Sequence, residues 1–409
     1  MTQNLPVADP AATPPRFPQA RGCPFHPPAA YARLHAEAPV TRITLPSGNR
    51  AWLITGYEQA RRFLADPRST ADRSLPAYPA VLPRQPVTKA QAKGLLTWMD
   101  PPEHTEHRRM VVNEFTTRRL RQLQPRIQEI IDGCVDRMLA TDGPVDLVEA
   151  FALPVPSLVI CELLGVRYAD RDLFGRYTIA ILNRDTGAED RVAAWRQLRV
   201  YLSDLVDDKV ANPGEDLLSR LVLKYQDAGT FDHELMVGLS MALLVAGHET
   251  TANMIALGVL ALLDHPDQRA ALVADPSTAP QVVEELLRFF SIADTSTSRV
   301  TTADIELDGV VIPAGDGVIV LNSLANRDPE TFADPDELDT TRAAARHHLA
   351  FGYGIHQCLG QNLARLELQL VFTTLFGRIP DLRLAVPSTE LSYKEDATFY
   401  GVYQVPVTW

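Results

Sequence analysis

The order of apolar and polar residues divides the chain into two kinds of segment. Between Val40 and Ile54, apolar residues alternate weakly with polar ones, which predicts short strands joined by a turn at Pro46–Asn49. From Asp100 to about Val222, apolar residues recur at helical spacing and predict a series of helices, the first capped by Asp100. The pattern therefore predicts a mainly α-helical protein with a small strand-rich part.

The longest helical run extends from Asp232 to Asp264 and would span roughly 50 Å at the rise of an α-helix. It is apolar enough to be tested as a membrane span, but His248, Glu249 and Asn253 lie near its centre. Charged and polar groups at that depth are costly in lipid. We therefore predict a long buried helix of a soluble protein and keep a membrane span as the less favoured alternative.

The pattern becomes mixed after this helix. Residues Val300–Val320 alternate and contain glycine turns, which predicts strands, and the tail Leu382–Trp409 has the same character. We expect a last helix from near Cys358 to about Phe376. The length of 409 residues alone predicts two or three domains, although no linker or internal repeat divides the chain.

Composition narrows the classes of function. The net charge is −12 at pH 7, so nucleic-acid binding would need a local basic patch and is not expected. The 4 cysteines are sparse, which favours a reducing compartment, the cytoplasm, over a disulfide framework. Met1–Arg21 has neither the basic start nor the apolar centre of a signal peptide. We expect residues 1–23 to form a flexible N-terminal segment.

The segment Phe351–Gly360 places Cys358 just before the last predicted helix. Free N–H groups and the positive end of the helix dipole would stabilise a thiolate there. Gly352, Gly354 and Gly360 permit positive φ angles and the close approach of a flat ligand. A lone cysteine does not make a zinc site, whereas a thiolate beside a large flat group fits haem. From spacing alone, a buried structural cysteine and a haem ligand are equally favoured.

A second polar segment, Ala246–Ala252, lies midway along the longest predicted helix. An acid and a hydroxyl side by side in a buried apolar helix are costly unless they are used or satisfied. Thr250 could hydrogen-bond to the preceding turn, which would bend the helix and open a small polar groove for water or dioxygen. The alternative is a packing kink whose polar groups are satisfied internally.

These segments carry a resemblance to a known family. Phe351-x-x-Gly354-x-x-x-Cys358-x-Gly360 resembles the haem-binding signature of the cytochrome P450 monooxygenases, and the segment at Ala246–Thr250 is similar to their oxygen-binding pattern. The likeness extends over residues 24–409 and is strongest to soluble actinomycete members. It implies a mainly α fold, in which residues 24–409 form a single triangular-prism helical haem domain with small β-sheets.

The resemblance also implies roles for single residues. Cys358 would be the metal ligand, holding the iron of haem b through its thiolate, while the catalytic residues would be Thr250, which hydrogen-bonds dioxygen, and Glu249, which supplies protons. The residues expected to bind the haem are His104, Arg108, Ala246, Arg299, Phe351, Gly352, His356, Cys358 and Gly360. Four of them, His104, Arg108, Arg299 and His356, would hold the propionates, because buried carboxylates need charged or hydrogen-bonding partners.

A further motif, Glu284-Glu-Leu-Leu-Arg288, looks like the Glu-x-x-Arg motif of the family. Glu285 and Arg288 lie on one helical face and can pair, and Arg342 occupies the position of the arginine that joins them. We assign these three residues a structural role beneath the haem. The family usually has Phe where this chain has Leu338, which affects only the local packing.

By family position, four regions should line a substrate pocket together with the turn at 398–400. They are Ala77–Leu96, Phe174–Trp195, the helix around Leu243–Ala246, and Ile292–Ser298. The individual residues expected there are Leu243, Ile292, Ala293, Thr295 and Phe399. Their apolar character indicates a bulky, largely apolar substrate such as a polyketide or macrolide, terpenoid, steroid or xenobiotic. Asp294, Thr295 and Thr297 would add polarity to the pocket.

The implied reaction is the hydroxylation or epoxidation of such a substrate with O2. Electrons from NAD(P)H would come through a separate ferredoxin reductase and ferredoxin to a monomeric enzyme that does not associate with membranes. The ferredoxin would dock beside Cys358 on basic groups, for which we name Arg109, Arg346, His348 and Arg365. The alternatives are a peroxide-using enzyme of the same fold and a non-catalytic haem-thiolate sensor or scaffold.

Overall fold

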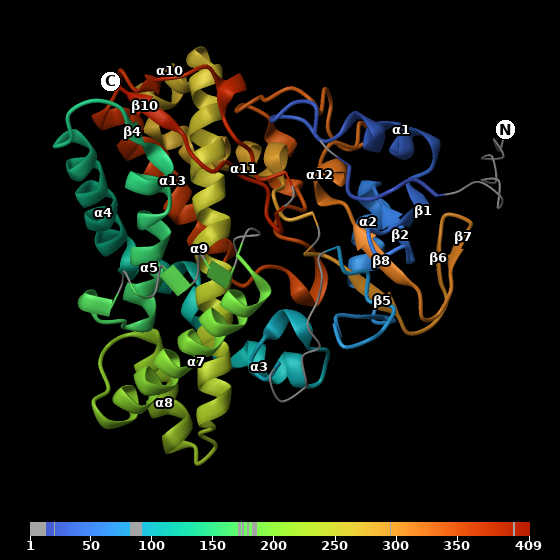
Figure 1. Ribbon diagram of the computed structural model, residues 1–409, viewed down its shortest axis with the longest axis horizontal. Coiled ribbons are helices and arrows are strands. Elements are labelled where there is room, and N and C mark those ends of the chain that lie inside the picture. The colour runs from blue at the N-terminus through green and yellow to red at the C-terminus, as the bar shows by residue number, and fades with distance from the viewer. Residues whose placement is uncertain are drawn as a thin grey trace.

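The computed structural model describes residues 14–19, 21–81, 92–170, 173, 176–177, 180–181, 186–294, 296–395 and 397–409. A body of helices occupies one side of the molecule and a smaller part, built around a sheet, occupies the other (Figure 1). Where the sequence predicted a mainly helical chain with a small strand-rich part, the structure has that architecture.

The helices of the body surround α9 (His233–Asp264), the longest predicted helix, which crosses the body from end to end (Figure 1). Helices α5, α7, α11 and α13 contact α9 directly. The helices are α1 Ala29–Glu37, α2 Tyr57–Ala65, α3 Glu103–Val111, α4 Thr117–Leu139, α5 Pro154–Leu164, α7 Ala188–Ala211, α8 Leu217–Asp227, α9 His233–Asp264, α10 Pro266–Ala274, α11 Ala279–Phe290, α12 Asn322–Ala325 and α13 Gln361–Arg378.

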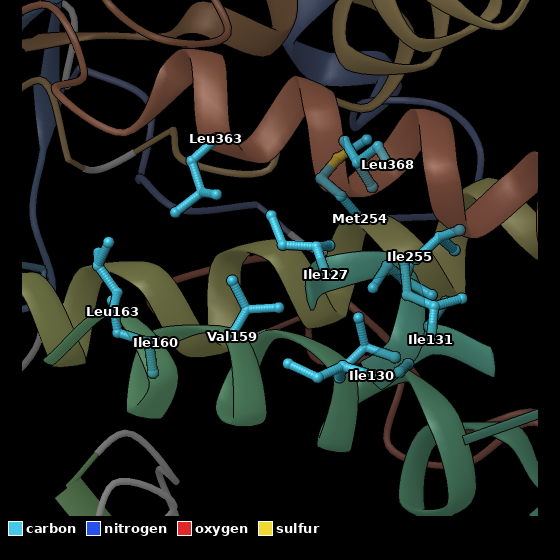
Figure 2. Packing of buried hydrophobic residues seen from close by; sticks show 14 of the residues in the cluster. Ile127, Ile130, Ile131, Val159, Ile160, Leu163, Met254, Ile255, Leu363 and Leu368 are labelled. Atoms are coloured by element: carbon cyan, nitrogen blue, oxygen red, sulfur yellow. The ribbon is translucent and has the colours of Figure 1, made fainter. Parts of the chain in front are cut away.

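The core between α4, α5, α9 and α13 explains why these segments fold together. Ile127 and Ile131 of α4, Val159 of α5 and Ile255 of α9 are almost completely buried against one another (Figure 2). Burying each such side chain contributes about 1.5–3 kcal/mol. At the crossing of α9 and α13, Gly258 is needed because a Cβ there would lie 2.4 Å from the ring of Phe372.

The α9 helix is the only described segment long and apolar enough to cross a membrane by length and composition. Of its most apolar 18-residue window, 67% is buried inside the protein. A core helix of a globular protein has this pattern, which agrees with the prediction of a buried helix.

The smaller part is built on a five-stranded sheet of order β1-β2-β8-β5-β3, in which only β2 and β8 run parallel. Arg299, the first residue of β5, is thereby placed opposite Val318 on the inner side of the sheet. Two further small sheets pair β4, β10 and β9, and β6 with β7. The strands are β1 Val40–Thr44, β2 Arg50–Ile54, β3 Ser69–Thr70, β4 Val145–Asp146, β5 Arg299–Thr301, β6 Ile305–Leu307, β7 Val310–Ile312, β8 Gly317–Val320, β9 Arg383–Leu384 and β10 Pro406–Thr408.

The prediction that Asp100 caps the helix that follows it was wrong. Asp100 does not cap α3, which begins after Pro102 without a side-chain cap. The Asp100 carboxylate instead accepts hydrogen bonds from the hydroxyl of Thr70 and from the backbone N–H of Ala71 at 3.0 Å. It therefore joins the end of β3 to the start of α3, which is the helix that carries His104 and Arg108.

The packed part of the chain begins earlier than the predicted boundary at residue 24. Phe17 is 3% exposed, and its N–H donates to the carbonyl of Thr44 at 2.9 Å. Further along, the guanidinium of Arg327 donates to the carbonyl of Phe25 at 2.8 Å and to that of Phe289 at 3.0 Å. Because the ring of Phe17 is buried and the backbone of Pro15 and Phe17 bonds to Thr44, residues 14–19 pack against β1.

Candidate active site

The loop around Cys358 is a tight hairpin of the backbone. The N–H of Cys358 donates to the carbonyl of Phe351 at 2.9 Å, and a short 3₁₀ turn, Gly354–His356, lies between them. Gly354 has a φ of 74°, and a Cβ there would lie 2.4 Å from the carbonyl oxygen of Leu64. The position therefore requires glycine on two grounds, and the loop is fixed against α2.

The surroundings of Cys358 act on its thiol in opposite directions. Burial raises the pKa of Cys358, while the backbone N–H groups of Gly360 and Gln361 and the charges of Arg108 and Arg365 lower it. These four groups stabilise negative charge on sulfur. Among the described residues, no group of three or more His, Cys, Asp or Glu side chains could hold a metal ion. The arrangement therefore suits a single anionic sulfur ligand rather than a site built from side chains alone.

Four cationic or hydrogen-bonding side chains gather beside this loop from three separate parts of the chain. His104 and Arg108 come from α3, Arg299 from β5 and His356 from the Cys358 loop. The ring centroids of His104 and His356 are 4.3 Å apart. Burial, followed by the charges of Arg299, His104 and Arg108, lowers the pKa of His356 to about 2. The cluster therefore places two arginine cations beside two histidines whose pKa values are lowered.

The polar atoms of this cluster are poorly satisfied. Within the described part of the chain, both ring nitrogens of His104 and Nε2 of His356 are buried without a hydrogen-bond partner. Asp100 is the nearest carboxylate, 4.0 Å from Nε2 of His356. Buried polar groups of native proteins are normally paired. Orphaned donors in an excess of positive charge fit a ligand that brings carboxylates, as the two propionates of a haem do.

The middle of α9 presents an open stripe. From Leu235 to Leu262 the helix is buried except at Ala242, Leu243, Val245, Ala246, Gly247 and Thr250. Leu243, Ala246 and Thr250 follow one another at helical spacing, so they share one face. The hydroxyl of Thr250 donates to the carbonyl of Ala246 at 2.8 Å. This is the expected bond to the preceding turn, and α9 continues as a helix through it.

Glu249 lies beside this stripe but points to a different partner. Its Oε1 is 3.0 Å from Nζ of Lys394, and both side chains are almost buried. The ammonium also donates to Oδ1 of Asn253 at 3.0 Å. Lys394 belongs to no motif and is distant from Glu249 in sequence, so no sequence pattern pointed to this pair.

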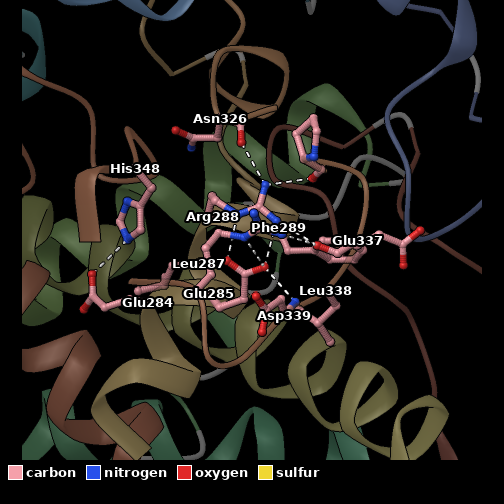
Figure 3. A network of polar contacts seen from close by, with 12 residues as sticks. Glu284, Glu285, Leu287, Arg288, Phe289, Asn326, Glu337, Leu338, Asp339 and His348 are labelled. Atoms are coloured by element: carbon pink, nitrogen blue, oxygen red, sulfur yellow. Dashed lines mark hydrogen bonds and ion pairs between the residues drawn. The ribbon is translucent and has the colours of Figure 1, made fainter. Parts of the chain in front are cut away.

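The Glu-x-x-Arg motif forms a closed network of polar contacts (Figure 3). Arg288 and Glu285 are both 0% exposed, and the guanidinium donates twice to the carboxylate, at 2.7 and 2.8 Å. The remaining donors of Arg288 reach the backbone carbonyls of Asn326, Pro335 and Glu337. Nε of Arg342 donates to Glu285 at 3.2 Å. These contacts join α11 to the irregular stretch before the Cys358 loop.

The predicted substrate-pocket residues divide into three groups. Leu243 and Ala293 are half-buried, Ile292 is buried, and Phe399 is half-buried on the C-terminal segment. The N–H of Tyr400 donates to the carbonyl of Ile292 at 2.9 Å, which brings two of the expected regions together. Thr295 lies outside the described residues, as do residues 82–91 and most of 171–185 in the first two of the four expected regions.

Two polar residues expected to face the substrate are occupied instead. Asp294 accepts from the N–H and the hydroxyl of Ser323, each at 2.8 Å. The hydroxyl of Thr297 donates to the carbonyl of Val320 at 2.7 Å. Asp294 therefore bonds to the start of α12 and Thr297 to the end of β8, rather than adding free polarity to a pocket.

Comparison with known proteins agrees with this geometry. The cytochrome P450 family model matches residues 278–379, the part that holds the Glu-x-x-Arg motif and the Cys358 loop. Cytochrome P450 105A3 of Streptomyces carbophilus is 50% identical over 97% of this chain and 96% of its own length. Vitamin D3 dihydroxylase of Streptomyces griseolus is 46% identical over 98% of this chain and 100% of its own length.

A solved structure has the same fold. The crystal structure of cytochrome P450 MoxA from Nonomuraea recticatena has a TM-score of 0.90 and 52% identity, with 96% of this chain and 98% of that chain covered. The chain belongs to the cytochrome P450 family. It is a haem-dependent monooxygenase of the bacterial, actinomycete type, which uses O2 and electrons derived from NAD(P)H.

Proposed function

We propose that this enzyme holds haem b through the thiolate of Cys358 and inserts one oxygen atom of O2 into a bulky, largely apolar small molecule. The observation that supports this proposal is the pairing of one half-buried cysteine with an adjoining cluster of unsatisfied donors. His104, Arg108, Arg299 and His356 would hold the propionates. Phe351, Gly352 and Gly360 would border the ring beside the sulfur, and Ala246 would border its opposite face.

Haem supplies the chemistry of oxygen activation, and the protein side chains supply binding and protons. The half-buried hydroxyl of Thr250 lies on the open stripe of α9, where it would orient O2 and hold water. The adjacent Glu249 carboxyl would carry protons from solvent to this stripe. General acid–base groups of this kind contribute about 10²–10⁴-fold to rate.

The substrate would lie against Leu243, Ile292, Ala293 and Phe399. Their apolar side chains favour a substrate with an extended apolar surface, and the name of the vitamin D3 relative fits that class. We propose hydroxylation as the reaction. Because Asp294 and Thr297 are occupied by Ser323 and Val320, specificity would depend on shape more than on hydrogen bonds.

Electrons would come from a ferredoxin that is reduced by its own reductase, in the cytoplasm, to a monomeric enzyme. Of the four basic residues expected at its docking face, Arg109 and Arg346 are exposed. His348 is buried 3.2 Å from Glu284, and Arg365 donates to the same carboxylate. We therefore propose Arg109 and Arg346 as docking residues and assign the other two to packing around Phe351, over whose ring Arg365 lies.

Two measurements test the proposal. The reduced, carbon-monoxide-bound protein is expected to show the strongly red-shifted Soret band of thiolate-ligated haem, and Cys358→His should abolish it. With ¹⁸O2 and a ferredoxin system, one labelled atom should enter the product. A Soret band of histidine-ligated haem in the unmodified protein would contradict the ligand assignment, and unlabelled product would contradict the reaction.

A further inference from the structure

Lys394 is the cation that the described residues place against Glu249. Its Nζ lies 3.0 Å from Oε1 of Glu249 and 3.0 Å from Oδ1 of Asn253. Glu249 and Asn253 are four residues apart, so the ammonium bridges two successive turns on one face of α9. The side chains of Lys394 and Glu249 are only 11% and 12% exposed. In such surroundings an ion pair is screened less than at the surface.

The backbone that carries Lys394 is fixed to α9. Its N–H donates to the carbonyl of Gly401 at 2.8 Å. Gly401 in turn packs so closely on α9 that a Cβ there would lie 2.3 Å from Oδ1 of Asn253. The N–H of Tyr400, the residue before Gly401, donates to the carbonyl of Ile292, and Phe399 comes directly before Tyr400. One short segment therefore carries a proposed pocket residue and the partner of the proposed proton carrier.

The neighbouring histidine does not compete for this role. His248 is buried, and burial together with the charge of Lys394 lowers its pKa to about 4. Its ring accordingly remains neutral near pH 7, and it hydrogen-bonds to the backbone of Leu153. Tyr403 presents its ring 5.7 Å from the Lys394 ammonium. The pairing of Glu249 with a cation therefore rests on Lys394.

We propose that Lys394 is a positioning residue for proton delivery: it holds the Glu249 carboxylate beside the open stripe of α9 in the orientation from which it receives and passes on protons. This inference rests on the proton-carrying role proposed for Glu249. The carboxylate takes up a proton that solvent supplies and then gives it up toward the Thr250 stripe, and the loss of that proton restores the carboxylate that pairs with Lys394. Without the ammonium, a nearly buried carboxylate has no cationic partner and loses its fixed orientation.

The test compares Lys394→Met with Lys394→Arg in the haem-loaded enzyme. Lys394→Met is expected to lower product formed per NAD(P)H consumed by about tenfold and to enlarge the effect of D2O on turnover, because proton transfer becomes slower. Lys394→Arg keeps a cation in place and should retain most of the coupling. The Soret band should stay unchanged in both variants.

A matched control is available elsewhere in the fold. Lys209 and Asp216 form an ion pair at 2.9 Å whose side chains are 10% and 9% exposed, close to the values for Lys394 and Glu249. Lys209→Met therefore reports the general cost of removing a buried lysine. It should reduce thermal stability without changing the coupling or the D2O effect. Equal losses of coupling in Lys209→Met and Lys394→Met would overturn the inference.

A double variant separates this inference from the function on which it rests. If Lys394 acts through the carboxylate, adding Lys394→Met to Glu249→Gln should change neither the coupling nor the D2O effect further. An additional loss in that background would show that Lys394 acts by another route. If the unmodified enzyme forms no product, the proposed function is wrong. If the unmodified enzyme forms product and Lys394→Met shows the same coupling and the same D2O effect, only the inference about Lys394 is wrong.

Discussion

Two groups of buried basic side chains lie near the Cys358 loop, and they differ in how fully their hydrogen-bonding atoms are satisfied. Arg288 is enclosed by the Glu285 carboxylate and three backbone carbonyls, so that each of its donor nitrogens has a partner. In the second group, the described residues give Arg299 one hydrogen bond, to the carbonyl of Ser298, and leave His104 without any. The first group completes the fold by itself, whereas the second needs a ligand.

The degree to which hydrogen bonds are satisfied thus distinguishes residues that stabilise the fold from residues that bind a ligand, whatever sequence motif they belong to. A satisfied network contributes to stability in the protein alone, while an unsatisfied one destabilises the protein until its ligand arrives. Removing a residue should therefore have opposite effects in the two groups. Substitutions in the two groups test that difference through their effects on stability and on haem affinity.

The largest effect is expected at Arg288. In Arg288→Met the Glu285 carboxylate would remain buried without its main partner, which costs about 3–5 kcal/mol of the free energy of unfolding. Arg288→Lys should not rescue it, because an ammonium cannot make the two parallel bonds to the carboxylate. Chemical denaturation followed by circular dichroism measures both. Unchanged denaturation midpoints in both variants would contradict the assignment of this network to stability.

A buried carboxyl without any cation provides the next test. Glu367 on α13 is 2% exposed, its Oε2 has no hydrogen-bond partner in the described part of the protein, and burial raises its pKa from 4.5 to about 8. The folded state thus binds this proton more tightly than the unfolded state. Stability should fall as pH rises from 4.5 to about 8, by on the order of 4 kcal/mol.

Glu367→Gln should remove this slope, because the amide does not titrate. The measurement is the free energy of unfolding at a series of pH values for the two proteins. The slopes should differ between pH 5 and 8 and coincide above that range. Parallel curves throughout would show that the carboxyl titrates normally.

The haem-binding cluster should respond in the opposite sense to Arg288. Arg299→Gln removes a buried cation whose pKa is lowered by burial and by the charge of Arg73, so the haem-free protein should keep or gain stability. Haem affinity should instead fall by about ten- to a hundredfold, the value of one charge-assisted hydrogen bond. Haem titration and thermal unfolding of the haem-free form measure the two effects. If haem-free Arg299→Gln were destabilised as strongly as Arg288→Met, the proposed difference between the two groups would be contradicted.

The smallest effect is expected at Glu284, where a satisfied carboxylate lies at the edge of the network (Figure 3). Although burial acts against it, hydrogen bonds from His348 and Arg365 lower the pKa of Glu284 from 4.5 to about 2. The stability that this contributes is present above pH 4.5 and is lost as pH falls toward 2.

With partial exposure taken into account, we expect Glu284→Gln to cost about 1–2 kcal/mol at pH 7. The cost should disappear at about pH 2–3, where the unmodified carboxyl is protonated as well. Acid unfolding midpoints of the two proteins measure this. A cost that stays constant down to acid pH would indicate lost packing rather than lost charge.

Sequence reasoning predicted the features whose residues lie close together in the chain. The Cys358 hairpin, the polar segment of α9 and the Glu-x-x-Arg pair each fit within a few turns of backbone, so spacing alone places their side chains. The family resemblance then predicted that His104, Arg108, Arg299 and His356 would meet, although α3, β5 and the loop are far apart in sequence. The structure brings these residues together.

Contacts between distant segments without a motif could not be predicted. Lys394 pairs with Glu249 only because the C-terminal segment folds over α9. His348 was expected to be a basic group of the docking face, but it is buried and its ring lies 3.2 Å from the carboxylate of Glu284. Asp100 had the position of a helix cap and instead bonds to β3. In each case a tertiary partner competed successfully with the local interpretation.

The way in which Arg288 and Arg342 are satisfied has a consequence for variation among sequences. Apart from Glu285, they donate to the backbone carbonyls of residues 326, 333–335 and 337. Every amino acid has a backbone carbonyl, so these bonds depend on where the backbone runs and not on the side chains at those positions. The side chains at positions 333 and 337 should therefore be replaceable without loss of these bonds, whereas Asn326, Arg327 and Phe332 in the same stretch are buried and cannot be exchanged freely.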